Sequence, residues 1–163
     1  LRHSRVHTRL QRELADRPGL ALHDLYAHYP EYWIDVPAEQ ARVTAARHLV
    51  WMHPIHWYGM PPLMKLWVDQ VLSQGWAYGR DGRALAGKRL TLVLSTGGAA
   101  SAYSEAGHHG HPFETFLLPY QQIARFTGLE WQPPWVFHDA HRASDAALAA
   151  HALALRQHLQ QER

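Results

Sequence analysis

The sequence predicts an α/β domain built on a doubly wound parallel sheet, with helices on both faces of the sheet. Segments of helical periodicity alternate along the chain with short apolar runs that are typical of buried strands. Two of these runs end abruptly in loops of aromatic, glycine and small polar residues, as ligand-binding loops of parallel sheets do. The chain has 163 residues, 47% of them hydrophobic and 18% charged. This size and composition fit a single globular domain over residues 1–163.

The first half of the chain predicts two helices and two strands. Residues 4–17 have helical periodicity, and Arg17-Pro18-Gly19 ends this helix. Its apolar side consists of Val6, Leu10 and Leu14. Next we expect a strand over 20–26, a loop over 30–37, a helix over 38–46 and a strand over 48–52. The last of these is an uninterrupted apolar run, which is typical of a strand buried on both faces.

The second half continues the alternation. Pro61-Pro62 opens a helix, because proline suits a first helical turn, and Gly75 closes it. The apolar face of this helix is made of Met64, Trp67, Val68, Val71 and Leu72. We then expect a turn over 78–82, a strand over 89–94, a helix over 112–127, a strand over 130–137 and a final helix marked by Leu148, Ala152, Leu155 and Leu159. Pro133-Pro134 should confine regular pairing of the strand to one end.

Composition excludes several classes of function. The formal charge is +2 and the basic residues are scattered, so nucleic-acid binding is not expected. The apolar runs are shorter than the roughly 18 residues of a membrane span, and no secretory signal opens the chain. Cysteine is absent, which excludes disulfides, thiolate metal sites and a cysteine nucleophile. We expect a soluble cytoplasmic protein.

Two loops follow the strands at 48–52 and 89–94. The first, residues 53–62, is rich in histidine, aromatic residues and glycine, and the second, residues 95–101, consists of small residues. Because the carboxyl ends of parallel strands meet at one edge of the sheet, we expect the two loops to form one shared ligand site.

Four segments of the chain carry a resemblance to a known family. These are residues 53–69, residues 75–79, residues 85–88 and residues 95–98. In this order they resemble the flavodoxin-like NAD(P)H:quinone oxidoreductases. The likeness is greatest to the bacterial ancillary reductases of glutathione-gated potassium efflux systems, and more distant to DT-diaphorase. The resemblance implies a flavodoxin-like sheet of strand order 2-1-3-4-5. A doubly wound domain normally begins with a strand, so we expect the first strand and its His-Pro pair before Leu1, missing from this sequence.

The resemblance also implies a flavin, FMN or FAD, at the carboxyl ends of the strands. Such an enzyme passes a hydride from NADH or NADPH through the flavin to a quinone in two half-reactions. Glycine at 97 and 98 would let the backbone approach the ring closely, and the phosphate would meet the start of the first helix. The residues implied in cofactor binding are Ser4, Arg5, Val6, His7, Ile55, His56, Trp57, Tyr58, Ser95, Thr96, Gly97 and Gly98. The family usually has asparagine where His7 stands and glutamine where His56 stands.

The segment 103–110 resembles the part of DT-diaphorase that carries its catalytic tyrosine and histidine. The resemblance therefore implies Tyr103 as a hydrogen-bond donor and His109 as the group that supplies or stabilises a proton. Reduction leaves negative charge on a ring nitrogen or on the quinone oxygen, and these groups would balance that charge.

Partners also follow from the resemblance. The family forms homodimers through the helix at 62–72 and the aromatic loop after it, so a homodimer is expected. The efflux-associated relatives bind the cytoplasmic side of a transporter. An alternative function is therefore a flavin-binding regulatory subunit of a potassium efflux transporter, at the inner face of the cell membrane.

Three other readings compete with these assignments. Trp57 and Tyr58 could serve core or dimer packing instead of a flavin pocket. His53, His56, His108, His109 and His111 invite a zinc site, but they lack a carboxylate at a recognised metal spacing, so no metal is predicted. Ser95 and Ser101 lack the context of a nucleophile elbow, which makes a serine hydrolase a weaker hypothesis.

Overall fold

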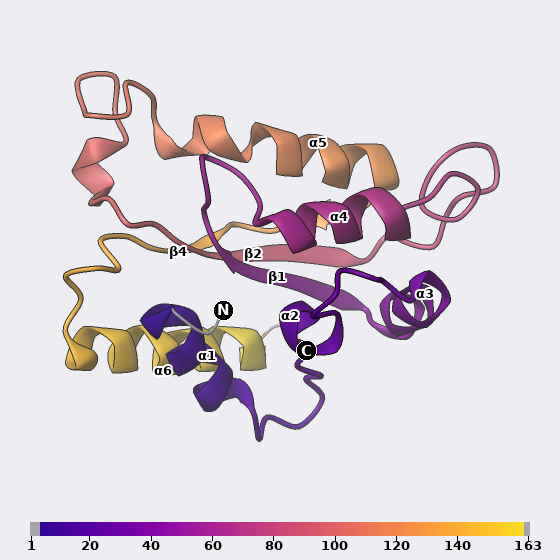
Figure 1. The fold of residues 1–163 in the computed structure, drawn as a ribbon, viewed down its shortest axis with the longest axis horizontal. Coiled ribbons are helices and arrows are strands. Elements are labelled where there is room, and N and C mark those ends of the chain that lie inside the picture. The colour runs from indigo at the N-terminus through magenta and orange to yellow at the C-terminus, as the bar shows by residue number, and fades with distance from the viewer. Residues whose placement is uncertain (1–3, 162–163) are drawn as a thin grey trace.

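The computed structural model describes residues 4–161, which form a parallel sheet between two layers of helices (Figure 1). The strands are β1 (His48–Pro54), β2 (Arg89–Ser95), β3 (Glu130–Trp131) and β4 (Trp135–Phe137). β2 pairs in parallel with β1 on one side and with β3 and β4 on the other. This arrangement confirms the α/β class, and the pairing order matches the 3-4-5 part of the expected sheet. The expected first strand lies outside the described residues.

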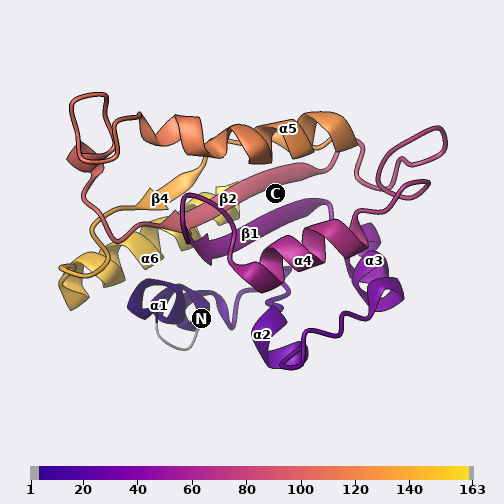
Figure 2. The same ribbon diagram turned by 45° about the horizontal axis from the view of Figure 1, so that its top comes forward.

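Helices cover both faces of the sheet. They are α1 (Arg5–Leu14), α2 (Leu25–His28), α3 (Val36–Ala45), α4 (Pro62–Val71), α5 (Leu118–Thr127) and α6 (Asp145–Gln161). α4 and α5 lie on one face, and α1 and α6 lie on the other (Figures 1 and 2). Among residues 4–161, no helix is both long enough and apolar enough to cross a membrane.

Strand β2 joins two hydrophobic cores. Leu90, Leu92 and Leu94 belong to the core beneath α4 and α5, and Val93 belongs to the core formed with α1 and α6. All four side chains are fully buried. Strand side chains alternate between the faces of a sheet, so this apolar run stabilises both layers.

The predicted helices mostly have the predicted positions. The marker residues of α6 are all buried: Leu148, Ala152, Leu155 and Leu159. α3 begins at Val36, two residues before the predicted start, because the side chain of Asp35 caps it by accepting from the amide of Ala38. The predicted helix 112–127 is divided into a 3₁₀ helix, Phe113–Leu117, and α5, and the left-handed Gly128 ends α5.

Three strand predictions were wrong in part. Residues 20–24 form no strand; Asp24 instead caps the short helix α2, and no strand within residues 4–161 pairs with 20–24. β1 is buried at alternate residues only, because Leu49 and Trp51 are buried in the core beneath α4 and α5, whereas Val50 and Met52 on the other face are partly buried. The predicted strand 130–137 pairs at both ends instead of one. Its proline pair interrupts the ladder, and the register with β2 then shifts by one residue, which is a bulge.

A buried carboxyl joins the segments before β1 to α4. Glu39 is 2% exposed, and its oxygens accept hydrogen bonds from Trp67 Nε1 at 2.8 Å and Tyr29 Oη at 2.7 Å, with His23 Nε2 also at 2.7 Å. Burial, aided by this contact with Glu39, raises the pKa of Tyr29 to about 12, so the phenol remains a donor at neutral pH. One carboxyl therefore ties three segments of the chain together.

Glu39→Ala should lower the free energy of unfolding by about 2–3 kcal/mol, because it leaves buried donors without an acceptor. Urea unfolding at pH 7 measures this, and Glu31→Ala, at an exposed site, is the matched control that should change stability by less than about 0.5 kcal/mol. Equal effects of the two substitutions would contradict this role of Glu39.

Candidate functional site

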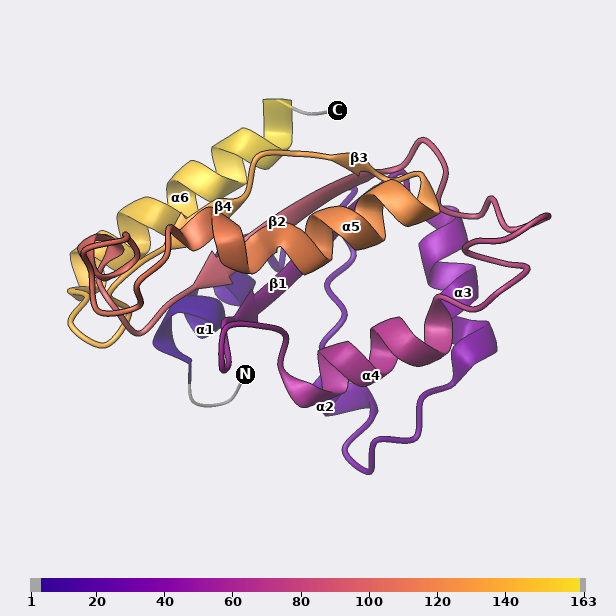
Figure 3. The same ribbon diagram turned by 90° about the horizontal axis from the view of Figure 1, so that it is seen from above.

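The loops after β1 and β2 lie side by side at the carboxyl edge of the sheet. The register of the two strands places Pro54 opposite Ser95, and the Ile55 amide donates to the Ser95 carbonyl at 2.9 Å. Figure 3 shows both loops leaving the same end of the sheet. The expected meeting of the two loops is thus present.

The first loop is a tight turn with an unusual backbone. His56 and Gly59 exchange two backbone hydrogen bonds, of 3.1 and 3.0 Å, around Trp57 and Tyr58. Both central residues are left-handed, with φ of 45° and 65°. Bulky residues rarely adopt this conformation, and such strain is concentrated at functional sites. The turn leaves Trp57 94% exposed, so this side chain has no packing role within the described chain.

Tyr58 points the other way, into an aromatic cluster. Its ring stacks on Phe116 with centroids 4.9 Å apart and meets His109 edge-on at 5.6 Å. Its hydroxyl lies 3.4 Å from His109 Nδ1. Tyr103 belongs to the same cluster: its ring stacks on that of His109, with the two centroids 4.2 Å apart. The two residues implied in catalysis are therefore neighbours, and both adjoin the first loop.

The second loop lies beneath the same cluster. A Cβ on Gly98 would approach His109 Nε2 to 3.2 Å and the Tyr103 ring to 3.5 Å, and a Cβ on Gly97 would clash with His141 Nε2 at 2.7 Å. Glycine at both positions thus permits two imidazoles to lie directly on the backbone. This is a reason for the glycine pair that the sequence did not reveal.

Buried polar groups connect the second loop to the first helix. His7 is fully buried, and its Nε2 lies 3.0 Å from the hydroxyl of Ser95, which is 2% exposed. Burial, reinforced by the nearby His53, lowers the pKa of His7 to about 3. The side chains of His7, Ser95 and the buried Val6 therefore face the interior, and any contact that they make with a cofactor would use backbone groups.

The start of α1 borders a basic cavity of about 470 Å³. It is lined by Ser4, Arg5, Thr8, Arg9, Arg12, Asp145 and Leu148. Ser4 caps the helix by accepting from the His7 amide at 3.3 Å, and Arg5 pairs with Asp145 at 2.7 Å. Unpaired amides at a helix start and guanidinium groups suit an anion such as a phosphate.

Tyr103 is suited to donate a proton or hydrogen bond. Burial raises the pKa of its phenol, an effect partly opposed by an interaction with the Thr96 hydroxyl. The phenol therefore keeps its proton at neutral pH. Among residues 4–161, no three histidine or acidic side chains lie close enough together to hold a metal ion.

Sequence reasoning missed three residues of this site: Phe116, His138 and His141. The last two follow β4, and backbone hydrogen bonds join their segment to the second loop. The rule that identified the first two loops, that ligand sites form at carboxyl ends of parallel strands, would also have identified this third strand end.

The site residues fit a flavin in outline. Aromatic rings, a glycine backbone at 97 and 98 that planar rings approach closely (here those of His141 and His109), and a basic cavity for phosphate are features that such a cofactor uses. The phenol of Tyr103 lies among these aromatic rings, where it could donate a hydrogen bond to an atom that becomes negative when a hydride is accepted.

Comparison with known proteins supports the same class. A family described by its flavodoxin-like fold matches residues 2–159. The chain is 40% identical to the glutathione-regulated potassium-efflux system ancillary protein KefF of Klebsiella aerogenes over 96% of this chain and 88% of that protein.

Solved structures share the fold. One described as a thermophilic tryptophan halogenase from Streptomycin violaceusniger has a TM-score of 0.91 and 38% identity, covering 94% of this chain and 90% of that one. General stress protein 14 of Treponema denticola, in complex with FMN, has a TM-score of 0.88 and 35% identity, covering 97% and 92%. An NADPH-quinone reductase from P. pentosaceus has a TM-score of 0.87 over 96% and 90%; at 22% identity it shows the fold alone.

Proposed function

This chain belongs to the family of flavodoxin-like fold that matches residues 2–159, and from that premise we propose that it is a flavin-dependent NAD(P)H:quinone oxidoreductase. The observation that carries the proposal is the stack of Tyr103 on His109 directly above Gly98, at the edge where both loops meet. The names of the relatives differ in the activity they describe, so the reaction is argued from these residues.

The chain's residues have distinct tasks in this proposal. Tyr58, Trp57 and Phe116 supply an aromatic wall, while the Gly97-Gly98 backbone supplies polar groups for the ring edge. Arg5 and the start of α1 hold the phosphate. A bound FMN or FAD would supply the capacity to accept a hydride from NADH or NADPH and to give it to a quinone.

Charge control falls to Tyr103 and His109. The phenol keeps its proton at neutral pH and can donate a hydrogen bond to an atom on which negative charge develops. His109, whose ring stacks on that phenol, can hold or deliver the proton that the reduced quinone needs.

The proposal is tested by the absorbance of the purified protein. Protein reconstituted with FMN or FAD should be yellow, should bleach anaerobically on addition of NADH or NADPH, and should recover its colour when a quinone is added. Failure to bind either flavin, or binding without bleaching, would overturn the proposal.

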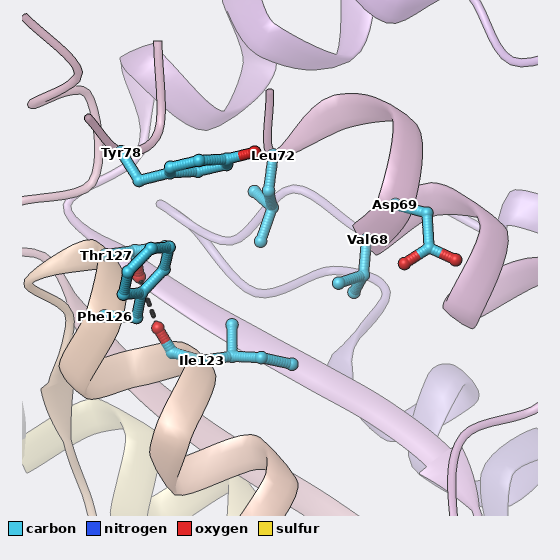
Figure 4. A pocket seen from close by; sticks show the side chains of 7 residues that line it. All are labelled: Val68, Asp69, Leu72, Tyr78, Ile123, Phe126 and Thr127. Atoms are coloured by element: carbon cyan, nitrogen blue, oxygen red, sulfur yellow. Dashed lines mark hydrogen bonds between the residues drawn. The ribbon is translucent and has the colours of Figure 1, made fainter. Parts of the chain in front are cut away.

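A homodimer is part of the proposal, formed through α4 and the aromatic loop after it. A groove of about 270 Å³ lies in this region, between α4 and α5, and Figure 4 shows the side chains that line it. Its lining residues are Val68, Asp69, Leu72, Tyr78, Ile123, Phe126 and Thr127. Phe126 is 62% exposed beside this apolar groove, which is where a second copy would pack.

Phe126→Glu should weaken the dimer about 10- to 100-fold, because a carboxylate replaces an apolar side chain within the interface. Light scattering over a dilution series measures the change. Leu153→Glu is the matched control: Leu153 is 50% exposed on α6, on the opposite face of the sheet, and its substitution should leave the dimer intact. A wild-type monomer at every concentration, or equal effects of the two substitutions, would contradict this interface.

The alternative role is a flavin-binding regulatory subunit of a potassium efflux transporter on the cytoplasmic side of the membrane. The observation in its favour is 40% identity over nearly the whole chain to a potassium-efflux ancillary protein. Co-purification with a transporter tests it. A Tyr103→Phe variant that still binds and regulates the transporter would separate this role from reductase activity.

A further inference from the structure

The segment after β4 is held against the second loop by its backbone. The Thr96 amide donates to the Phe137 carbonyl at 3.0 Å, the Asp139 amide to the Gly98 carbonyl at 2.9 Å, and the Ala140 amide to the Thr96 carbonyl at 2.9 Å. Asp139 adopts a left-handed φ of 57° at this crossing. These bonds make the loop and the segment one unit at the site.

The Thr96 hydroxyl lies at the centre of this unit. It donates to the Gly98 carbonyl at 2.8 Å, and it lies 2.9 Å from His138 Nδ1. A threonine hydroxyl has a single proton, and Thr96 uses that proton in its hydrogen bond to the Gly98 carbonyl. His138 must therefore donate from Nδ1, which leaves its Nε2 as the unprotonated nitrogen of the neutral ring.

The surroundings of His138 keep the ring neutral and fixed. Burial lowers its pKa, with a smaller opposing effect from Glu114. The ring meets Phe113 edge-on at 5.1 Å and Tyr103 at 5.6 Å. Tyr103 also interacts with the Thr96 hydroxyl, so His138 contacts the proposed proton donor directly and through Thr96.

We propose that His138 is a positioning residue of the reductase site: its Nδ1–H directs the Thr96 hydroxyl toward Gly98 and thereby fixes the loop and the Tyr103 phenol. Its catalytic consequence rests on the proposed reductase function. The tautomer of its ring does not depend on that function.

Three substitutions separate positioning from packing. His138→Asn keeps an N–H donor near the place of Nδ1, His138→Gln moves the donor toward the place of Nε2, and His138→Leu removes it. In the FMN-loaded protein, His138→Leu and His138→Gln should slow flavin reduction by NAD(P)H about 10-fold, with the KM for NAD(P)H little changed. His138→Asn should stay within about 3-fold of wild type and should retain wild-type FMN affinity, whereas His138→Leu and His138→Gln should weaken FMN binding several-fold.

A second readout needs no flavin. In protein with isotope-labelled histidine, NMR should assign the Nδ1–H tautomer to His138, and Thr96→Val should alter that resonance. An Nε2–H tautomer would overturn the proposal, and so would Asn, Gln and Leu variants with equal rates and equal FMN affinity. A wild-type protein that binds no flavin would overturn the reductase function instead, while the tautomer would still decide the His138–Thr96 contact.

Discussion

The free energy of unfolding should fall steeply as the pH is lowered from about 6.5 toward 4, because two buried imidazoles must be neutral in the folded protein. His7 is fully buried and His53 is 3% exposed. Burial lowers the pKa of His7 to about 3 and that of His53 to about 4. His7 Nδ1 and His53 Nε2 are buried with no hydrogen-bond partner in the described chain, so neither ring has an acceptor for a second proton there.

The sign follows from proton binding. In the unfolded chain both groups titrate near 6.5, so below that pH the unfolded state binds more protons than the folded state. The stability due to neutral burial is complete above about pH 6.5 and is lost as the pH falls toward the folded values. Each pKa unit corresponds to about 1.4 kcal/mol, so each histidine should cost about 2 kcal/mol at pH 5.

Urea unfolding at pH 7 and pH 5 measures this loss. His7→Asn should reduce the difference between the two pH values by about 2 kcal/mol, the share of one histidine, although it lowers stability at pH 7 by about 1 kcal/mol through the lost contact with Ser95. His108→Gln, at an exposed site, is the matched control and should leave the difference unchanged. If wild type and His7→Asn lose the same stability, buried neutral His7 is not the cause.

The fold was predictable where one physical rule acts alone. The apolar run at Leu90, Leu92, Val93 and Leu94 predicts a strand, and all four side chains are fully buried. Helical spacing likewise identified the buried face of α6. An apolar run or an apolar helix face is buried against whichever apolar layer lies next to it. Both elements could therefore be predicted without knowing the neighbouring segment.

The prediction failed where a neighbour decides the structure. Residues 20–24 have strand composition, but a strand requires a paired edge, and Asp24 instead caps α2. The bulge between Trp131 and Trp135 depends on how β2 resumes pairing after two prolines. The lack of a paired edge and the point at which pairing resumes are not encoded in a local pattern.

The site shows the same division. Strand ends predicted that the loops at 53–62 and 95–101 would meet, and the Ile55 amide donates to the Ser95 carbonyl where they do. The place of Tyr103 and His109 came from resemblance, because a long loop has no periodicity from which to argue. The cover of Gly97 by His141 and the Thr96–His138 contact require coordinates, because they join residues more than 40 positions apart.

Replacing Tyr103 and His109 should produce the largest loss of the proposed reductase activity. Tyr103→Phe removes the phenolic hydroxyl but keeps the stacked ring. It should slow flavin reduction or quinone turnover about 100-fold. His109→Gln should slow turnover about 10-fold. FMN affinity should change little, because neither substitution alters the basic cavity or the glycine pair. Stopped-flow absorbance measures the two half-reactions separately.

The double variant decides whether the two residues act together. Their rings stack at 4.2 Å, and if His109 acts through the Tyr103 phenol, Tyr103→Phe already removes its path to the substrate. The double variant should then be about as slow as Tyr103→Phe, a non-additive result expected of groups that act as a unit. Multiplied losses of about 1000-fold would mean two independent roles. His111→Gln is the matched control in the same loop, and unchanged rates in all of these variants would remove the catalytic assignment while leaving flavin binding intact.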